Sequence, residues 1–165
     1  MKAAFFFLLL AISFAANGVL WRRVNRLEKQ LATPAGEYPL GENMGYMQRY
    51  AEKLWYAGEA GNWTLAGFYR DEIAETQEGI VRAHVTADGI DVSRRLSAML
   101  PPSVEAVGQA VAARDPAQFR HSYQAMVNTC NACHAASQHG FIRIAVPAGA
   151  PVHWNQSFAV PAAKP

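Results

Sequence analysis

Apolar residues recur every three or four positions along most of this 165-residue chain, which is the period of an α-helix. No segment is rich in strand-forming residues, so the sequence predicts an all-α fold. Helices with short connections between them favour an antiparallel four-helix bundle. The periodicity predicts helices over residues 40–60, 63–84, 92–100 and 103–114, and a last one between Asp115 and Gly140.

Polar and glycine residues mark where these helices begin and end. Asn62 and Asp115 are predicted N-caps, because their side-chain oxygens can accept from backbone N–H groups of the first turn. The stretch from Thr86 to Asp91 contains Gly89 and is predicted to be a loop. Prolines and glycines in IRIAVPAGAPVHW exclude a long helix after Gly140. An irregular tail that packs on the domain is therefore expected.

The N-terminus is almost entirely apolar from Ala3 to Trp21. As a helix, these nineteen residues would extend about 28 Å, close to the hydrocarbon thickness of a bilayer. They predict either a signal peptide cleaved after Ala15 or an uncleaved membrane anchor, and both export the rest of the chain. The predicted organisation is a leader over residues 1–21, an amphipathic stalk with linker over residues 22–39, a helical domain over residues 40–140 and a tail over residues 141–165.

The charge is unevenly distributed. A formal net charge of +2 is too small to indicate a nucleic-acid partner, and 51% hydrophobic residues exclude a disordered chain. Residues 1–31 carry five basic and one acidic residue, whereas residues 32–165 carry ten basic and twelve acidic ones. The helical domain is thus slightly acidic, and a docking partner is expected to be basic rather than acidic.

Both cysteines fall in one pentapeptide, Cys130-Asn131-Ala132-Cys133-His134. C-x-x-C-H is the attachment signature of c-type haem. On a helix, the two thiols lie on one side of a turn and can bond to the two vinyl groups of one porphyrin, while His134 can bind the iron as proximal ligand. One covalent haem c is therefore the expected cofactor.

Other interpretations of the pentapeptide explain less. A structural zinc site needs four ligands, and the sequence has no second cysteine pair. A thioredoxin-like pair needs a βαβ context, which is missing. A simple disulfide would close a very small loop and leave His134 without a role.

A single CNACH motif late in the last helix of a four-helix domain resembles the class II c-type cytochromes, the cytochrome c′ group. The resemblance covers roughly residues 40–140 and depends mainly on Cys130, Cys133 and His134. The family usually ends soon after its motif, whereas this chain continues for thirty-one residues past His134. The resemblance implies a monohaem protein and leaves a homodimer open.

The sixth iron ligand is less constrained than the proximal one. An up-down-up-down bundle brings the end of the last helix level with the start of the first helix and the end of the second. In low-spin relatives, a methionine of the first helix binds the iron, and Met44 and Met47 both match that position. The alternatives are no sixth protein ligand, His84 and, from the tail, His153.

Function depends on which group, if any, is the sixth iron ligand. With Met44 or Met47 bound, the protein is predicted to carry electrons between redox partner proteins. With an open distal side, it would instead bind NO or CO. A third hypothesis is a non-redox subunit in which haem stabilises an interaction module. No catalytic constellation is present, so an enzyme is not expected. The expected location is the periplasmic side of the cytoplasmic membrane, anchored or released.

Overall fold

The computed structural model describes residues 13–14, 17–24 and 38–162. The chain divides into two compact units, Met1–Glu37 and Tyr38–Pro165. Residues 17–24 are helical, but most of the predicted leader and stalk lie outside the described residues. Among the residues that are described, no helix is both long enough and apolar enough to cross a membrane.

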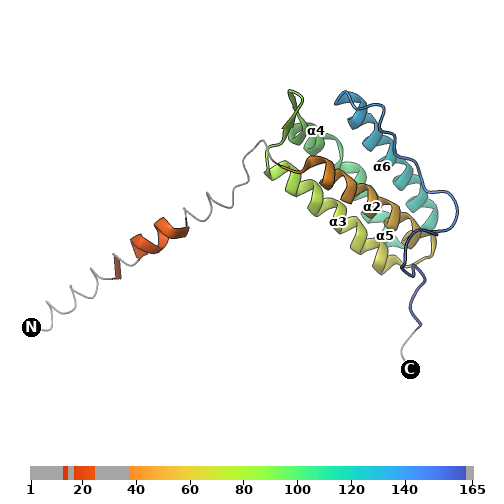
Figure 1. Ribbon diagram of the computed structural model, residues 1–165. Coiled ribbons are helices and arrows are strands. Elements are labelled where there is room, and N and C mark those ends of the chain that lie inside the picture. The colour runs from red at the N-terminus through yellow and green to blue at the C-terminus, as the bar shows by residue number, and fades with distance from the viewer. Residues whose placement is uncertain (1–12, 15–16, 25–37, 163–165) are drawn as a thin grey trace, which may run out of the picture. The chain divides into compact units, whose positions relative to one another are not determined.

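The described part of the second unit is mostly helical, which confirms an all-α class (Figure 1). α2 packs against α3, α3 against α5, and α5 against α6. The short α4 contacts α3, α5 and α6. The bounds of these helices are Leu40–Glu59 for α2, Trp63–Arg82 for α3, Val92–Met99 for α4, Pro101–Ala113 for α5 and Pro116–Ala136 for α6.

The two predicted N-caps are confirmed. The side-chain oxygen of Asn62 accepts from the backbone N–H of Leu65 at 3.2 Å and caps α3. Asp115 Oδ1 accepts from the N–H groups of Ala117 and Gln118 at 2.9 and 3.0 Å and caps α6. Each cap satisfies donors that have no partner within the helix, so local sequence fixes both starts.

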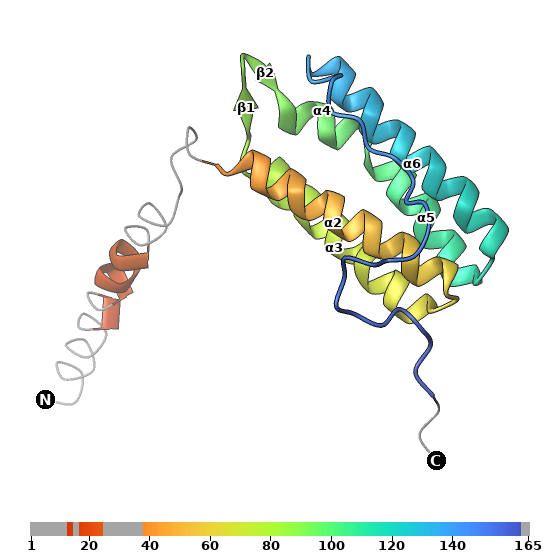
Figure 2. The ribbon, with the colours of Figure 1, turned by 45° about the vertical axis from the view of Figure 1, so that its right-hand side comes forward.

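The predicted loop between α3 and α4 is instead a small hairpin (Figure 2). Its strands are β1, Thr86–Ala87, and β2, Ile90–Asp91, paired antiparallel. Asp88 and Gly89 between them have φ of 52° and 76°. Asp-Gly favours positive φ at both central positions of a two-residue hairpin turn, and this signal explains the hairpin.

Three further expectations need correction. α5 begins at Pro101 rather than Ser103, because proline is tolerated in the first helical turn, where its missing N–H has no partner. α6 ends at Ala136 rather than near Gly140, and the chain turns at Gln138, whose φ is 62°. The helical period of residues 63–84 predicts that Phe68 lies beside a buried stripe that includes Tyr69 and Ile73, but Phe68 is 52% exposed.

The core is dominated by large apolar side chains from four helices. Phe119 is fully buried against Trp55, Trp63 and Tyr123. A Cβ on Gly58 would lie 2.2 Å from the Phe119 ring, so only glycine allows α2 to approach it. The largest fully buried side chains are Tyr123, Phe119, Leu54, Ile80, Met126 and Val107.

The tail runs back along the helices from the end of α6, beside α2 and α6 (Figure 2). Its described residues form neither helix nor strand. His153 Nε2 lies 2.7 Å from a Glu52 carboxylate oxygen, and the Asn62 side-chain amide donates to the carbonyl of Ala159 at 3.0 Å. Phe158 is only 6% exposed. The tail is therefore held to the helical unit at these points, while Phe141 and Val152 are 79% and 89% exposed.

Candidate functional site

The pentapeptide lies in the last two turns of α6. Cys133 is buried, and Cys130 and His134 are partly buried. Both cysteines are free thiols. Since they are three positions apart on a helix, the two side chains lie on neighbouring parts of one face.

Burial controls the protonation of both thiols. It raises the pKa of Cys130 to about 11. It also raises the pKa of Cys133, although the Ser137 hydroxyl and the Arg95 charge oppose the rise. Thiolates are the reactive and metal-binding form, and burial disfavours that form in both cysteines. Among the described residues, no group of three or more His, Cys, Asp and Glu could hold a metal ion.

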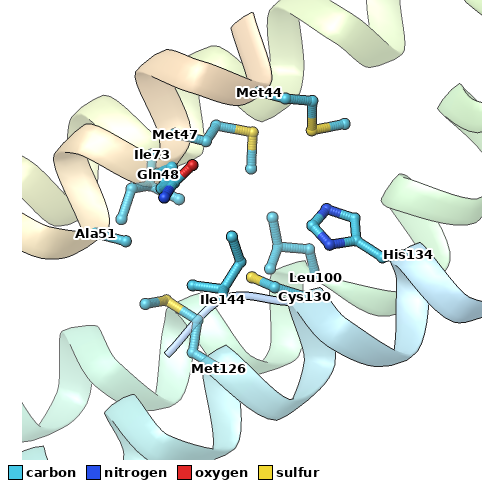
Figure 3. Close-up of a pocket in the computed structure, with 10 residues that line it drawn as sticks. All are labelled: Met44, Met47, Gln48, Ala51, Ile73, Leu100, Met126, Cys130, His134 and Ile144. Carbon is cyan, nitrogen blue, oxygen red and sulfur yellow. The ribbon is translucent and has the colours of Figure 1, made fainter. Parts of the chain in front are cut away.

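A small cavity of about 50 Å³ separates α2 from the pentapeptide (Figure 3). Met44 and Met47 project into it from α2, while Cys130 and His134 project from α6. Met47 is 8% exposed and belongs to the core, whereas Met44 is partly buried. The structure thus brings the two predicted methionines and the motif histidine to the same cavity.

A larger cavity of about 390 Å³ adjoins the small one and shares Met44, Gln48, His134 and Ile144 with it. Its volume is within the range of about 300–1,000 Å³ typical of ligand pockets. None of the described residues lining it is Asp, Glu, Lys or Arg. The remaining lining residues are Leu40, Gly41, Gly45, Ala87, Ile90, Val92, Cys133, Ser137, His139 and Ile142.

Two glycines form part of the α2 wall of this larger cavity. Gly41 and Gly45 are one helical turn apart, and a Cβ built on either meets no described atom within 4 Å. Glycine inside a helix costs roughly 0.5–1 kcal/mol relative to alanine. No packing within the chain requires glycine at these positions, and both Cβ atoms would extend into open space. The α2 backbone is therefore accessible from the cavity at these two positions.

The orientation of His134 is set by the tail. His134 Nδ1 lies 3.0 Å from the backbone carbonyl oxygen of Ile142. Because a carbonyl oxygen only accepts, Nδ1 carries the hydrogen and donates it. This tautomer leaves Nε2 with a free lone pair, which is the arrangement of a metal-binding histidine whose other nitrogen is fixed by a carbonyl.

The other predicted ligands lie elsewhere. His84 is exposed after the end of α3, with φ of 50°, and lines neither cavity. His153 contacts Glu52 and also lines neither. Ile142 and Ile144 also line the site. Their apolar character indicated contact with the domain but not a place at the site, because that place depends on where the tail packs.

The residues that could hold a cofactor lie at this end of the unit. Both thiols line apolar cavities, one histidine has a free Nε2, and the facing helix lacks side chains at Gly41 and Gly45. No protein-family model, curated protein or solved structure matches the chain. The assignment therefore depends on the geometry and chemistry of these residues.

Proposed function

We propose that the chain is an exported monohaem c-type cytochrome that carries electrons, similar to class II cytochromes and without enzymatic activity. α2, α3, α5 and α6 would form its antiparallel four-helix bundle, with the haem at the end where α6 finishes. The observation that carries the proposal is His134: it follows two spaced thiols, its Nδ1 is fixed by Ile142, and it faces methionines of α2.

Three side chains would hold the cofactor. The Cys130 and Cys133 thiols would each add across one vinyl group, with sulfur bonding to one carbon and hydrogen to the other, so that nothing leaves and no oxidant is needed. His134 would bind the iron through Nε2. When bound, haem iron supplies a one-electron couple between its ferrous and ferric forms.

Met44 is the best-placed sixth ligand. It lines both cavities beside His134, whereas Met47 lines only the small one and is more deeply buried. A methionine opposite the histidine would close the sixth position to small ligands and favour electron transfer. The apolar walls would keep water away from the site.

Export and partners follow from the sequence pattern. The apolar leader would place the haem unit on the periplasmic side of the cytoplasmic membrane, either anchored or released. The slight acidity of residues 32–165 favours basic redox partner proteins. A homodimer is compatible with the resemblance.

Absorption spectroscopy of the haem-loaded protein tests the electron-transfer function. We expect a six-coordinate, low-spin spectrum in both oxidation states. Met44→Ala should convert most of the protein to high spin, while Met47→Ala should do so much less. A five-coordinate ferrous spectrum in the wild type would contradict the proposal.

The cavity beside His134 also favours a second function, the binding of NO or CO at an open distal side. The larger cavity is apolar and adjoins the histidine, which suits a small neutral ligand. Rapid CO binding to the reduced wild type would support gas binding. Failure to bind CO would exclude it and leave electron transfer.

A further inference from the structure

Asn131 lies within the pentapeptide, yet its side chain contacts the tail. Its Nδ2 donates to the backbone carbonyl of Ile144 at 2.9 Å, and its Oδ1 accepts from the backbone N–H of the same residue at 2.8 Å. One side-chain amide thus satisfies both backbone polar groups of Ile144, much as a neighbouring strand would. We call this pair of hydrogen bonds the Asn131 clasp.

The clasp lies two residues from the carbonyl that contacts the motif histidine. Ile142 accepts from His134 Nδ1 at 3.0 Å, and its own N–H donates to the carbonyl of His139 at 2.9 Å. The segment from Ile142 to Ile144 is therefore fixed at both ends. Ile144 is held to α6, and Ile142 is held to α6 and to the turn that follows it. Because Ile142 is only two positions from Ile144, its carbonyl has little freedom to move while the clasp is intact.

The side chain of Ile144 couples the clasp to the site. It lines both cavities, together with Met44 and His134. Figure 3 shows Ile144 near Cys130 and Met126 on the side of the small cavity opposite Met47. Moving this segment would therefore change both the cavity wall and the hydrogen bond to His134.

We propose that Asn131 is a positioning residue for the iron ligand: through its clasp on Ile144 it holds the Ile142 carbonyl against His134 Nδ1. The inference rests on the proposed haem function and adds a role for a motif position between the two cysteines. It also gives the tail a role at the site.

A carbonyl that accepts from Nδ1 makes an imidazole a more basic ligand, and partners of this kind are important for metal sites. A more basic ligand stabilises ferric over ferrous iron, so it lowers the reduction potential. Loss of the clasp should weaken the hydrogen bond between the Ile142 carbonyl and His134 Nδ1. The reduction potential should then rise, and the iron–histidine stretching frequency should fall.

The experiment compares four full-length proteins produced with haem c attachment: wild type, Asn131→Ala, Asn131→Asp and Asn128→Ala. Asn128 is the matched control, because it is exposed on the same helix and its side chain contacts only Gln124 among the described hydrogen bonds. Spectroelectrochemistry gives the potential. Resonance Raman spectra of the ferrous proteins, each also carrying Met44→Ala, give the iron–histidine stretching frequency, because this vibration is observed in five-coordinate ferrous haem. Attached haem is counted by mass before either measurement.

We expect Asn131→Ala to raise the potential and lower the stretching frequency, with Asn128→Ala unchanged. Asn131→Asp keeps the acceptor for the Ile144 N–H but loses the donor, so it should shift both values less. If Asn131→Ala fails to fold, as judged by circular dichroism, Asn131→Asp carries the comparison. Ile144→Pro removes the backbone N–H that donates to Asn131 Oδ1. Because both changes break the same clasp, combining Ile144→Pro with Asn131→Ala should shift the potential little further than either change alone.

Wild-type values in both Asn131 variants, with haem attached, would overturn the positioning role and leave the cytochrome proposal intact. A wild-type protein that carries no covalent haem would instead reject the proposed function, and this inference with it. The haem count separates the two failures.

Discussion

The two ends of α2 use glycine for opposite reasons. Near its C-terminus, Gly58 lies against the Phe119 ring in an aromatic cluster that leaves no room for a methyl group. We call this the closed end. Near its N-terminus, Gly41 and Gly45 border the larger cavity, and nothing described lies within 4 Å of an added Cβ. We call this the cavity end.

The comparison separates a glycine required by close packing from glycines that border open space. At the closed end, close packing makes the fold sensitive to any added volume. At the cavity end, two helical glycines, apolar side chains, His134 and His139 line the space. One end of α2 is thus closely packed, and the other borders the cavity where we propose that haem binds.

Gly58→Ala should have the largest effect on stability. The new Cβ would lie 2.2 Å from the Phe119 ring, which is fully buried and cannot move aside freely. Overpacking of this kind costs about 3 kcal/mol of unfolding free energy. Urea denaturation measures the loss, with Gly45→Ala as the matched control. A Gly58→Ala protein as stable as the wild type would contradict the close packing of the closed end.

Asn62→Ala should cost about 2 kcal/mol, because it removes both the cap of α3 and the hydrogen bond to the tail carbonyl of Ala159. Asn62→Asp keeps the cap acceptor and loses only the amide donor, so it should cost less. Thermal unfolding of both variants separates the two roles. Equal losses would show that the cap contributes nothing beyond the tail contact, and an Asn62→Asp protein as stable as the wild type would show that the tail contact contributes nothing.

Tyr123→Phe should cost about 1 kcal/mol near neutral pH, because the Tyr123 hydroxyl donates to the Ala51 carbonyl at 2.8 Å in the core. Burial raises the pKa of Tyr123 well above its ordinary value of 10.0. Above pH about 10, the unfolded chain therefore loses this proton first, and wild-type stability falls as the pH rises. Denaturant midpoints between pH 8 and 11 should fall less steeply in Tyr123→Phe. An unchanged slope would contradict this account.

Gly45→Ala should have the smallest effect and the opposite sign. In the haem-free protein, the added methyl meets no described atom, so better helix propensity should stabilise the fold by about 0.5–1 kcal/mol. With haem attached, we expect this gain to disappear, because the methyl would enter the binding space. Thermal unfolding of both forms tests this, and an equal gain in each would show that haem does not approach Gly45.

Local signals predicted much of the fold. Asn62 and Asp115 cap the helices that follow them because the interaction needs only three or four consecutive residues. The hairpin at Asp88 was missed even though Asp-Gly is also a local signal. The exposure of Phe68 depends on which neighbour covers α3, and the helical period alone does not determine this.

The candidate site was predictable in part for the same reason. The spacing of Cys130, Cys133 and His134 is local. Topology left Met44, Met47 and His84 as candidates, and the family resemblance favoured the two methionines, which the structure brings to the cavity shared with His134. The contacts of Ile142 and Ile144 were not predictable, because they require the irregular tail to return along α6.

The central claim is covalent attachment of one haem, and denaturing mass spectrometry of the full chain tests it most directly. After production with a haem c attachment system, the wild type should carry the added mass of one haem, and this mass should survive unfolding. The Cys130→Ala/Cys133→Ala protein should have the mass of the bare polypeptide. A bare wild-type chain would contradict the claim, as would a double variant that retains the haem.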